Sequence, residues 1–123
     1  MKVTCGTDII EIERIKSSIE KFGEKFIKTV FTENEIEYCE SKKEQKYQHY
    51  AARFAAKEAV YKALSNTENA PERWNTIEVI NEENGRPKII LENEVPNLEQ
   101  IDISLSHCKL YAVANVIVNL KEN

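Results

Sequence analysis

One stretch of this chain constrains its fold more than any other. Residues 47–64 contain no glycine, proline or asparagine and include six alanines. Alanine has the highest helix propensity of all residues, whereas glycine and proline are the strongest helix breakers. The stretch therefore predicts a long helix. Its small side chains lie on every face, so neighbouring elements can approach it closely.

The residues before this helix change from a strand pattern to a helical one. Residues 3–10 are rich in β-branched side chains, which favours a strand. Isoleucine and phenylalanine then recur at helical spacing as far as Phe31, which predicts one or two helices with a break at Gly23. Thr32 and Glu35 have the spacing of a capping box, so a short third helix is expected to begin there.

The residues after the long helix have the character of β-strands. Residues 76–80 and 88–91 flank an Asn84-Gly85 pair, which is a strong hairpin signal. Residues 101–107 and 111–120 alternate between apolar and polar or mixed positions, as strands with one buried face do. The order of strand, helices and further strands predicts an α+β fold and argues against a doubly wound α/β fold.

Size and charge limit the possible functions. A chain of 123 residues predicts a single domain over residues 1–123. The net charge of −4 argues against nucleic-acid binding through a broadly basic surface. No apolar stretch approaches the roughly 18 residues of a membrane span, and the N-terminus lacks the apolar segment of a signal peptide. The three cysteines lack metal-ligand spacing, which favours reduced thiols in the cytoplasm. From the charge and the apolar pattern we expect neither nucleic-acid nor membrane partners.

Charged side chains interrupt the alanine-rich helix in an unusual way. At about 100° per residue, Arg53 and Lys57 share one face, whereas Glu58 and Lys62 share another. The ordinary interpretation is that Glu58 and Lys62 form an exposed ion pair worth about 0.3–0.5 kcal/mol. The alternative is that neighbouring elements surround these charges, in which case they are paired, metal-bound or functional.

Two further residues are candidates for chemistry. Asp8 lies near the end of the first strand, where it either caps the following helix or directs a carboxylate into a site. A carboxylate pair of Asp8 and Glu58 would suit Mg²⁺, which prefers hard oxygen ligands. His107 ends a strand and is either structural or functional, whereas His49 has no recognisable companion in the sequence. With only three glycines, the chain has neither a P-loop nor a dinucleotide-binding glycine motif.

One segment is basic within this acidic chain. Residues 14–28 contain five lysines and arginines and two glutamates, a local net charge of +3. Such a segment is most often a solvated helix face, but it also favours encounter with an acidic protein partner.

Several segments together resemble a known enzyme family. They occur in the family's order across nearly the whole chain: residues 6–12 with Arg14 and Ile15, residues 31–35, residues 53–59 with Lys62 and Ala63, residues 74–79, residues 85–87 and residues 103–107. The chain is thereby identified as similar to the holo-(acyl carrier protein) synthases, which are small 4′-phosphopantetheinyl transferases. The resemblance implies the fold of that family, an antiparallel sheet packed against a long central helix.

The resemblance also implies a reaction and its catalytic residues. The family transfers the 4′-phosphopantetheine group of coenzyme A to a serine of apo acyl carrier protein and releases adenosine 3′,5′-bisphosphate. This reaction belongs to fatty acid biosynthesis. By resemblance, Asp8 and Glu58 hold Mg²⁺, Lys62 stabilises charge at the phosphoryl centre, and Glu58 helps to remove the serine proton.

The remaining implied roles concern binding and assembly. The coenzyme A site comprises Arg53, Lys62, Gly85, Arg86, Pro87 and His107. The carrier-protein surface comprises Arg14, Lys21 and Lys25. The family acts as a homotrimer with active sites between subunits.

This chain departs from the family pattern at one place. A glycine-containing turn usually follows the long helix, where this chain has Ser65, Asn66 and Thr67. Asparagine tolerates the left-handed conformation, which allows such a turn to persist.

Two other classes of function remain open from the sequence. The chain is either a non-catalytic module that binds acidic partners through residues 14–28, or a structural oligomer whose helix charges hold subunits together. The transferase is the leading hypothesis because Asp8, Glu58, Lys62 and His107 occur together in matching contexts.

Overall fold

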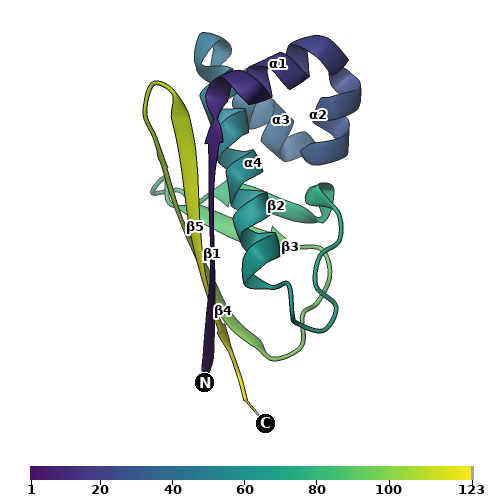
Figure 1. The fold of residues 1–123 in the computed structure, drawn as a ribbon, viewed down its shortest axis with the longest axis vertical. Coiled ribbons are helices and arrows are strands. Elements are labelled where there is room, and N and C mark those ends of the chain that lie inside the picture. Colours follow the sequence, from purple (N-terminus) through teal and green to yellow (C-terminus); the bar gives the residue numbers. More distant parts are fainter. Residues whose placement is uncertain (123) are drawn as a thin grey trace.

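The predicted long helix runs lengthwise through the middle of the molecule (Figure 1). The shorter helices gather at one end of the molecule, and the strands lie beside the long helix. The computed structural model describes residues 1–122. Its elements are β1 (Lys2–Glu11), α1 (Ile12–Phe22), α2 (Glu24–Val30), α3 (Glu33–Glu40), η1 (Lys43–Gln45), α4 (Lys46–Ala63), η2 (Trp74–Thr76), β2 (Ile77–Asn81), β3 (Pro87–Leu91), β4 (Leu98–His107) and β5 (Tyr111–Leu120). This order confirms the α+β class, and no helix within residues 1–122 is long and apolar enough to cross a membrane.

The strands form two antiparallel sheets, whereas the family resemblance implies a single antiparallel sheet. Strand β5 lies between β1 and β4, and β2 pairs only with β3. The short turn at residues 108–110 folds β5 back onto β4, and the turn containing Gly85 closes β2 onto β3. Each turn therefore pairs its own two strands, which leaves β3 and β4 in different sheets.

Alternation along β5 fixes which face of the larger sheet is buried. Ala112, Ala114, Val116, Val118 and Leu120 are buried, and the residues between them are exposed or half-buried. The last four of these side chains pack against alanines of α4 in one core cluster, whereas Ala112 belongs to a second cluster formed with the helices. The period-2 pattern of the sequence thus places β5 correctly.

Close contact between β1 and α4 depends on a glycine. A Cβ atom placed on Gly6 would lie 2.0 Å from the carbonyl oxygen of Ala59. The Thr4 hydroxyl in the same strand donates a hydrogen bond of 2.7 Å to the carbonyl oxygen of Ala63. The backbones of β1 and α4 are therefore in contact at these residues. As a result, residues next to Gly6 on β1 lie close to residues next to Ala59 on α4.

Local signals for helix ends are confirmed. The capping box is complete, since the Glu35 amide donates to the Thr32 hydroxyl (3.3 Å) and the Thr32 amide donates to the Glu35 carboxylate (2.9 Å). Gly23 adopts φ 61° between α1 and α2, a conformation that glycine tolerates best. After α4, however, the left-handed residue of the loop is Asn69 (φ 60°) and not Asn66. The turn itself is closed by the Thr67 amide, which donates to the Leu64 carbonyl oxygen.

A buried ion pair joins the helices to the smaller sheet. Lys57 of α4 and Glu35 of α3 are 2.7 Å apart, and both side chains are 0% exposed. The Lys57 ammonium also donates to the carbonyl oxygens of Trp74 and Ile77, and Glu35 accepts a hydrogen bond of 2.8 Å from the Val79 amide. Burial lowers the pKa of Lys57 from its ordinary value, while the Glu35 carboxylate opposes that shift. The full set of partners ties together α3, α4, η2 and β2.

This pair makes a specific prediction about stability. Lys57→Met leaves the Glu35 carboxylate buried without a counter-charge, so we expect the free energy of unfolding to fall by about 3–5 kcal/mol. Adding Glu35→Gln removes the isolated charge, and the double variant should be more stable than Lys57→Met alone. Urea unfolding of the two single variants and the double variant measures the coupling. Additive effects of the two substitutions would contradict the interpretation.

Candidate functional site

A groove at one side of the molecule gathers most of the residues predicted to bind the nucleotide. Arg53, Gly85, Arg86, Pro87 and His107 line this cavity of about 410 Å³. They come from α4, from the β2–β3 turn and from the end of β4. Lys62, which the family resemblance also assigns to the coenzyme A site, does not line the groove. We call this cavity the arginine groove.

Arg53 is held at the base of the arginine groove and has spare hydrogen-bonding capacity. Its side chain is only 3% exposed, its Nη2 donates to Asn81 Oδ1 (2.8 Å), and its guanidinium lies 4.1 Å from the centre of the Tyr38 ring. Its Nε is buried without a hydrogen-bond partner. A buried donor without a partner is costly, which favours an acceptor supplied by a ligand.

The two histidines of the chain meet in the same groove. The ring centres of His49 and His107 are 6.4 Å apart, and the Tyr38 ring lies edge-on at 5.6 Å from His49. Burial lowers the pKa of His49, and the positive charges of Arg53 and Lys42 lower it further. No companion for His49 is recognisable in the sequence because His107 lies on a distant strand, and only the fold brings the two rings together.

Asp8 pairs with Lys62. The structure thereby contradicts two ordinary interpretations of the sequence, an ion pair between Glu58 and Lys62 and a capping role for Asp8. The Lys62 ammonium lies 3.1 Å from Asp8 Oδ1 and donates a hydrogen bond of 2.9 Å to the Thr7 carbonyl oxygen. Within residues 1–122, Lys62 makes this ion pair and none with Glu58. Asp8 does not cap the next helix, since the N-cap position is Glu11 and no side chain forms a capping bond there.

Glu58 of α4 lies in a pocket that is separate from the arginine groove. It is half-buried, and its Oε1 accepts a long hydrogen bond of 3.4 Å from the indole of Trp74. Tyr61 and Arg73 also line this pocket, whose volume is about 230 Å³. Trp74 belongs to a segment that carries the family resemblance, but no sequence pattern connects it with Glu58, which lies 16 residues earlier in the chain.

Asp8 and Glu58 offer a limited donor set for a metal ion. They flank the backbone contact between Gly6 and Ala59, so both carboxylates start from elements that touch. Within residues 1–122, no cluster of three or more His, Cys, Asp or Glu side chains is arranged to hold a metal. Two carboxylates nevertheless fit Mg²⁺, which is commonly bound by one or two protein carboxylates, water and substrate phosphates.

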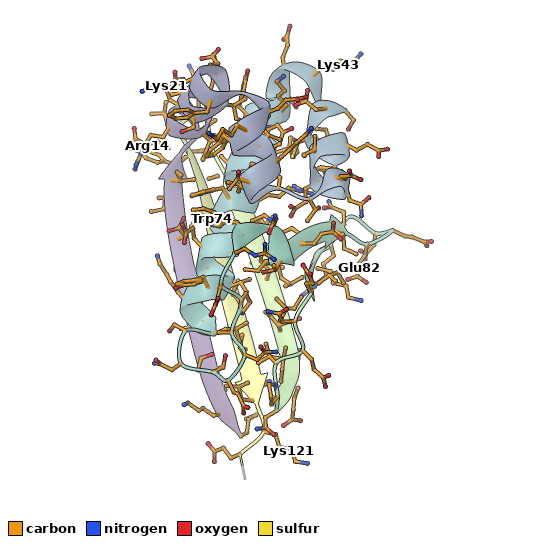
Figure 2. The ribbon with its side chains drawn as sticks, turned by 90° about the vertical axis from the view of Figure 1, so that its right-hand side faces the viewer. Arg14, Lys21, Lys43, Trp74, Glu82 and Lys121 are labelled. Atoms are coloured by element: carbon orange, nitrogen blue, oxygen red, sulfur yellow. The ribbon has the colours of Figure 1, made fainter. Side chains whose placement is uncertain are left out.

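The predicted carrier-protein residues lie on the helical end. Arg14 and Lys21 belong to α1, and both are exposed on the same end of the molecule, opposite Lys121 (Figure 2). Lys25 is an exposed residue of α2. The three side chains therefore belong to one helical layer that is distinct from the arginine groove.

Comparison with known proteins places the chain in a family. The model of the 4′-phosphopantetheinyl transferase superfamily matches residues 4–116. The chain belongs to this superfamily. It is 46% identical to the holo-[acyl-carrier-protein] synthase of Ruminiclostridium cellulolyticum, with 100% of this chain and 96% of that protein covered. It is 43% identical to the synthase of Protochlamydia amoebophila, with 93% and 95% covered.

Solved structures of the superfamily have the same fold. A holo-(acyl-carrier-protein) synthase from Bacillus anthracis in complex with CoA (3′,5′-ADP) superposes with a TM-score of 0.80, at 33% identity over 96% of each chain. A Helicobacter pylori synthase in complex with coenzyme A also gives 0.80, at 29% identity over 94% of this chain and 99% of that one. The family and fold predicted from the sequence are thereby confirmed.

Within this transferase, the predicted site residues form three groups. The arginine groove contains Arg53 and His107, Asp8 pairs with Lys62 beside β1, and Glu58 faces Trp74. The structure therefore brings Arg53, Gly85, Arg86, Pro87 and His107 together in the groove but leaves Lys62 and the two carboxylates outside it.

Proposed function

We propose that this protein is a holo-(acyl carrier protein) synthase. It transfers the 4′-phosphopantetheine group of coenzyme A to a serine hydroxyl of apo acyl carrier protein and releases adenosine 3′,5′-bisphosphate. The arginine groove carries the proposal, because it gathers the residues expected to bind the nucleotide around Arg53, whose buried Nε has no hydrogen-bond partner. Relatives at up to 46% identity share the name of this activity, and the related B. anthracis and H. pylori structures contain coenzyme A.

The side chains outside the groove suit phosphoryl transfer, which depends on positioning and charge neutralisation more than on covalent catalysis. Glu58 is a half-buried carboxylate able to accept the proton of the attacking serine. Lys62 has an ammonium group that is half exposed beside Asp8, from where it neutralises charge on phosphoryl oxygens. Asp8 holds Lys62 in place through their ion pair.

Asp8 and Glu58 are also the residues that would hold Mg²⁺. When bound, the ion neutralises charge on the phosphate oxygens of coenzyme A. The two carboxylates approach the site from β1 and α4, and the absence of a Cβ on Gly6 permits that approach.

We further propose that the active protein is a homotrimer with active sites between subunits. The arginine groove and the Asp8–Lys62 pair lie in different places on one subunit, so a complete site requires a second copy. The outer face of the larger sheet supports this assembly, since it exposes Val3 (56%), Ile9 (64%) and Ile117 (48%) to solvent. Exposed apolar side chains that lie together on one face are typical of interaction surfaces.

The carrier protein docks on Arg14, Lys21 and Lys25 in this proposal. Residues 14–28 have a local net charge of +3 in a chain of −4, which attracts an acidic partner. In this proposal, attachment of the phosphopantetheine group to the carrier protein serves fatty acid biosynthesis in the cytoplasm.

A transfer assay tests the proposed function directly. The protein is incubated with coenzyme A, Mg²⁺ and apo acyl carrier protein, and mass spectrometry measures the mass of the added arm. We expect complete modification that EDTA abolishes. Glu58→Gln should lower kcat by about 10²–10⁴-fold because the proton acceptor is lost. Glu37→Gln removes an exposed carboxylate of α3 and serves as the matched control. An unmodified carrier protein at micromolar enzyme would refute the proposal.

Charge reversal tests the docking surface. We expect Arg14→Glu and Lys21→Glu each to raise KM for the carrier protein by about tenfold, with a smaller effect at high salt. Neither substitution should change KM for coenzyme A, because neither residue lines the arginine groove. Lys43→Glu changes the net charge equally at another exposed position and is the control. An equal effect of all three substitutions would show that only total charge matters.

Light scattering tests the trimer. The expected mass is three times 14.2 kDa, and Ile9→Glu should yield monomers because it places a charge on the apolar outer face. If active sites lie between subunits, the monomeric variant should also lose transfer activity. Ile90→Glu substitutes an exposed isoleucine of the smaller sheet and should leave the mass unchanged. A monomeric wild-type protein with full activity would contradict the proposal.

A further inference from the structure

The arginine groove has a charge composition that the nucleotide assignment alone does not explain. Its lining includes the guanidinium groups of Arg53 and Arg86 and the imidazoles of His49 and His107. None of the residues that line it within the described part of the chain is an aspartate or glutamate. An anion that enters therefore meets donors on several sides and no opposing carboxylate.

His49 is the least obvious of these groups, because the family resemblance assigned it no role. It is half-buried on the first turns of α4, where its ring contacts the edge of Tyr38 from α3. The charged and titratable groups that face it are Lys42 after α3, Arg53 on its own helix and His107 on β4.

These neighbours give His49 a defined protonation state in the free protein. Burial and the positive charges of Arg53 and Lys42 lower its pKa below the ordinary value of 6.5, so the imidazole is neutral at pH 7. A phosphate group carries a charge of about −1.5 to −2 at pH 7. Its arrival in the groove neutralises the cations that repel a proton from His49 and adds an attractive charge, which raises the pKa of the imidazole.

We propose that His49 takes up a proton when a phosphate group of the nucleotide enters the arginine groove, so that nucleotide affinity increases as pH falls. The inference rests on the proposed function, which supplies the nucleotide. It assigns His49 a binding role beside Arg53 and explains why a second imidazole lies 6.4 Å from His107 in a groove already rich in cations. By linkage, one proton taken up per ligand changes the affinity by at most about tenfold per pH unit.

Proton NMR tests the inference with little ambiguity, since the chain contains only two histidines. The C2–H resonances are titrated in the free protein and with adenosine 3′,5′-bisphosphate, and the His49→Phe spectrum assigns them. Phenylalanine keeps an aromatic ring against Tyr38, and a thermal melt confirms that the variant is folded. We expect the nucleotide to raise the His49 titration midpoint and adenosine, which lacks phosphate, to leave it unchanged.

Calorimetry in two buffers with different ionisation enthalpies provides an independent measurement. The phosphate monoester itself titrates near pH 6, so the difference between wild type and variant isolates the imidazole. His49→Phe should remove most of the proton uptake and flatten the pH dependence of affinity, whereas His107→Asn should retain the uptake by His49.

The possible results separate the two proposals. Binding of adenosine 3′,5′-bisphosphate with an unchanged His49 titration, or proton uptake that survives in His49→Phe, overturns the role of His49 alone. Absence of any binding overturns the nucleotide assignment and the inference that rests on it.

Discussion

The buried Lys57–Glu35 pair is the interaction on which the arrangement of the molecule depends. Two charges without solvent exposure are stable only when every donor and acceptor has a partner, and here these partners come from α3, α4, η2 and β2. The pair therefore fixes the hairpin of β2 and β3 relative to α4. Arg53 lies one helical turn before Lys57, and Glu58 directly follows Lys57. The same pair thus sets the position of the β2–β3 turn over Arg53 and that of Trp74 beside Glu58.

Small residues make a second contribution, because they determine how close β1 lies to α4. The missing Cβ of Gly6 and the alanines of the helix allow contact between backbones. At that distance, the Lys62 side chain reaches both Asp8 and the carbonyl oxygen of Thr7. A larger residue at position 6 would move the strand outward and lengthen the Asp8–Lys62 contact. The alanine content that first predicted a helix is therefore also a requirement of the site.

The sequence predicts what depends on neighbouring residues and fails where distant residues meet. The Thr32 capping box, the Gly23 break, the helix over residues 46–63 and the alternation in β5 follow from local patterns, and the structure contains all of them. The two-sheet arrangement was not predicted, because pairing between strands depends on where the turns direct them. The candidate site residues stay predictions, and the contacts that these residues make do not follow from the sequence. The partners of Lys57, Lys62 and His49 lie on other elements, and no periodicity in the chain identifies them.

The uneven distribution of charge reconciles an acidic protein with anionic substrates. A net charge of −4 disfavours extended polyanions, whose binding requires many cations over a wide surface. The arginine groove and the basic helices instead offer two small clusters of cations, which suit the proposed binding of one phosphate-bearing molecule and one acidic protein face. In the groove, burial and the positive charges of Arg53 and Lys42 lower the pKa of His49, so the proposed proton uptake by His49 would add positive charge there only when a phosphate binds.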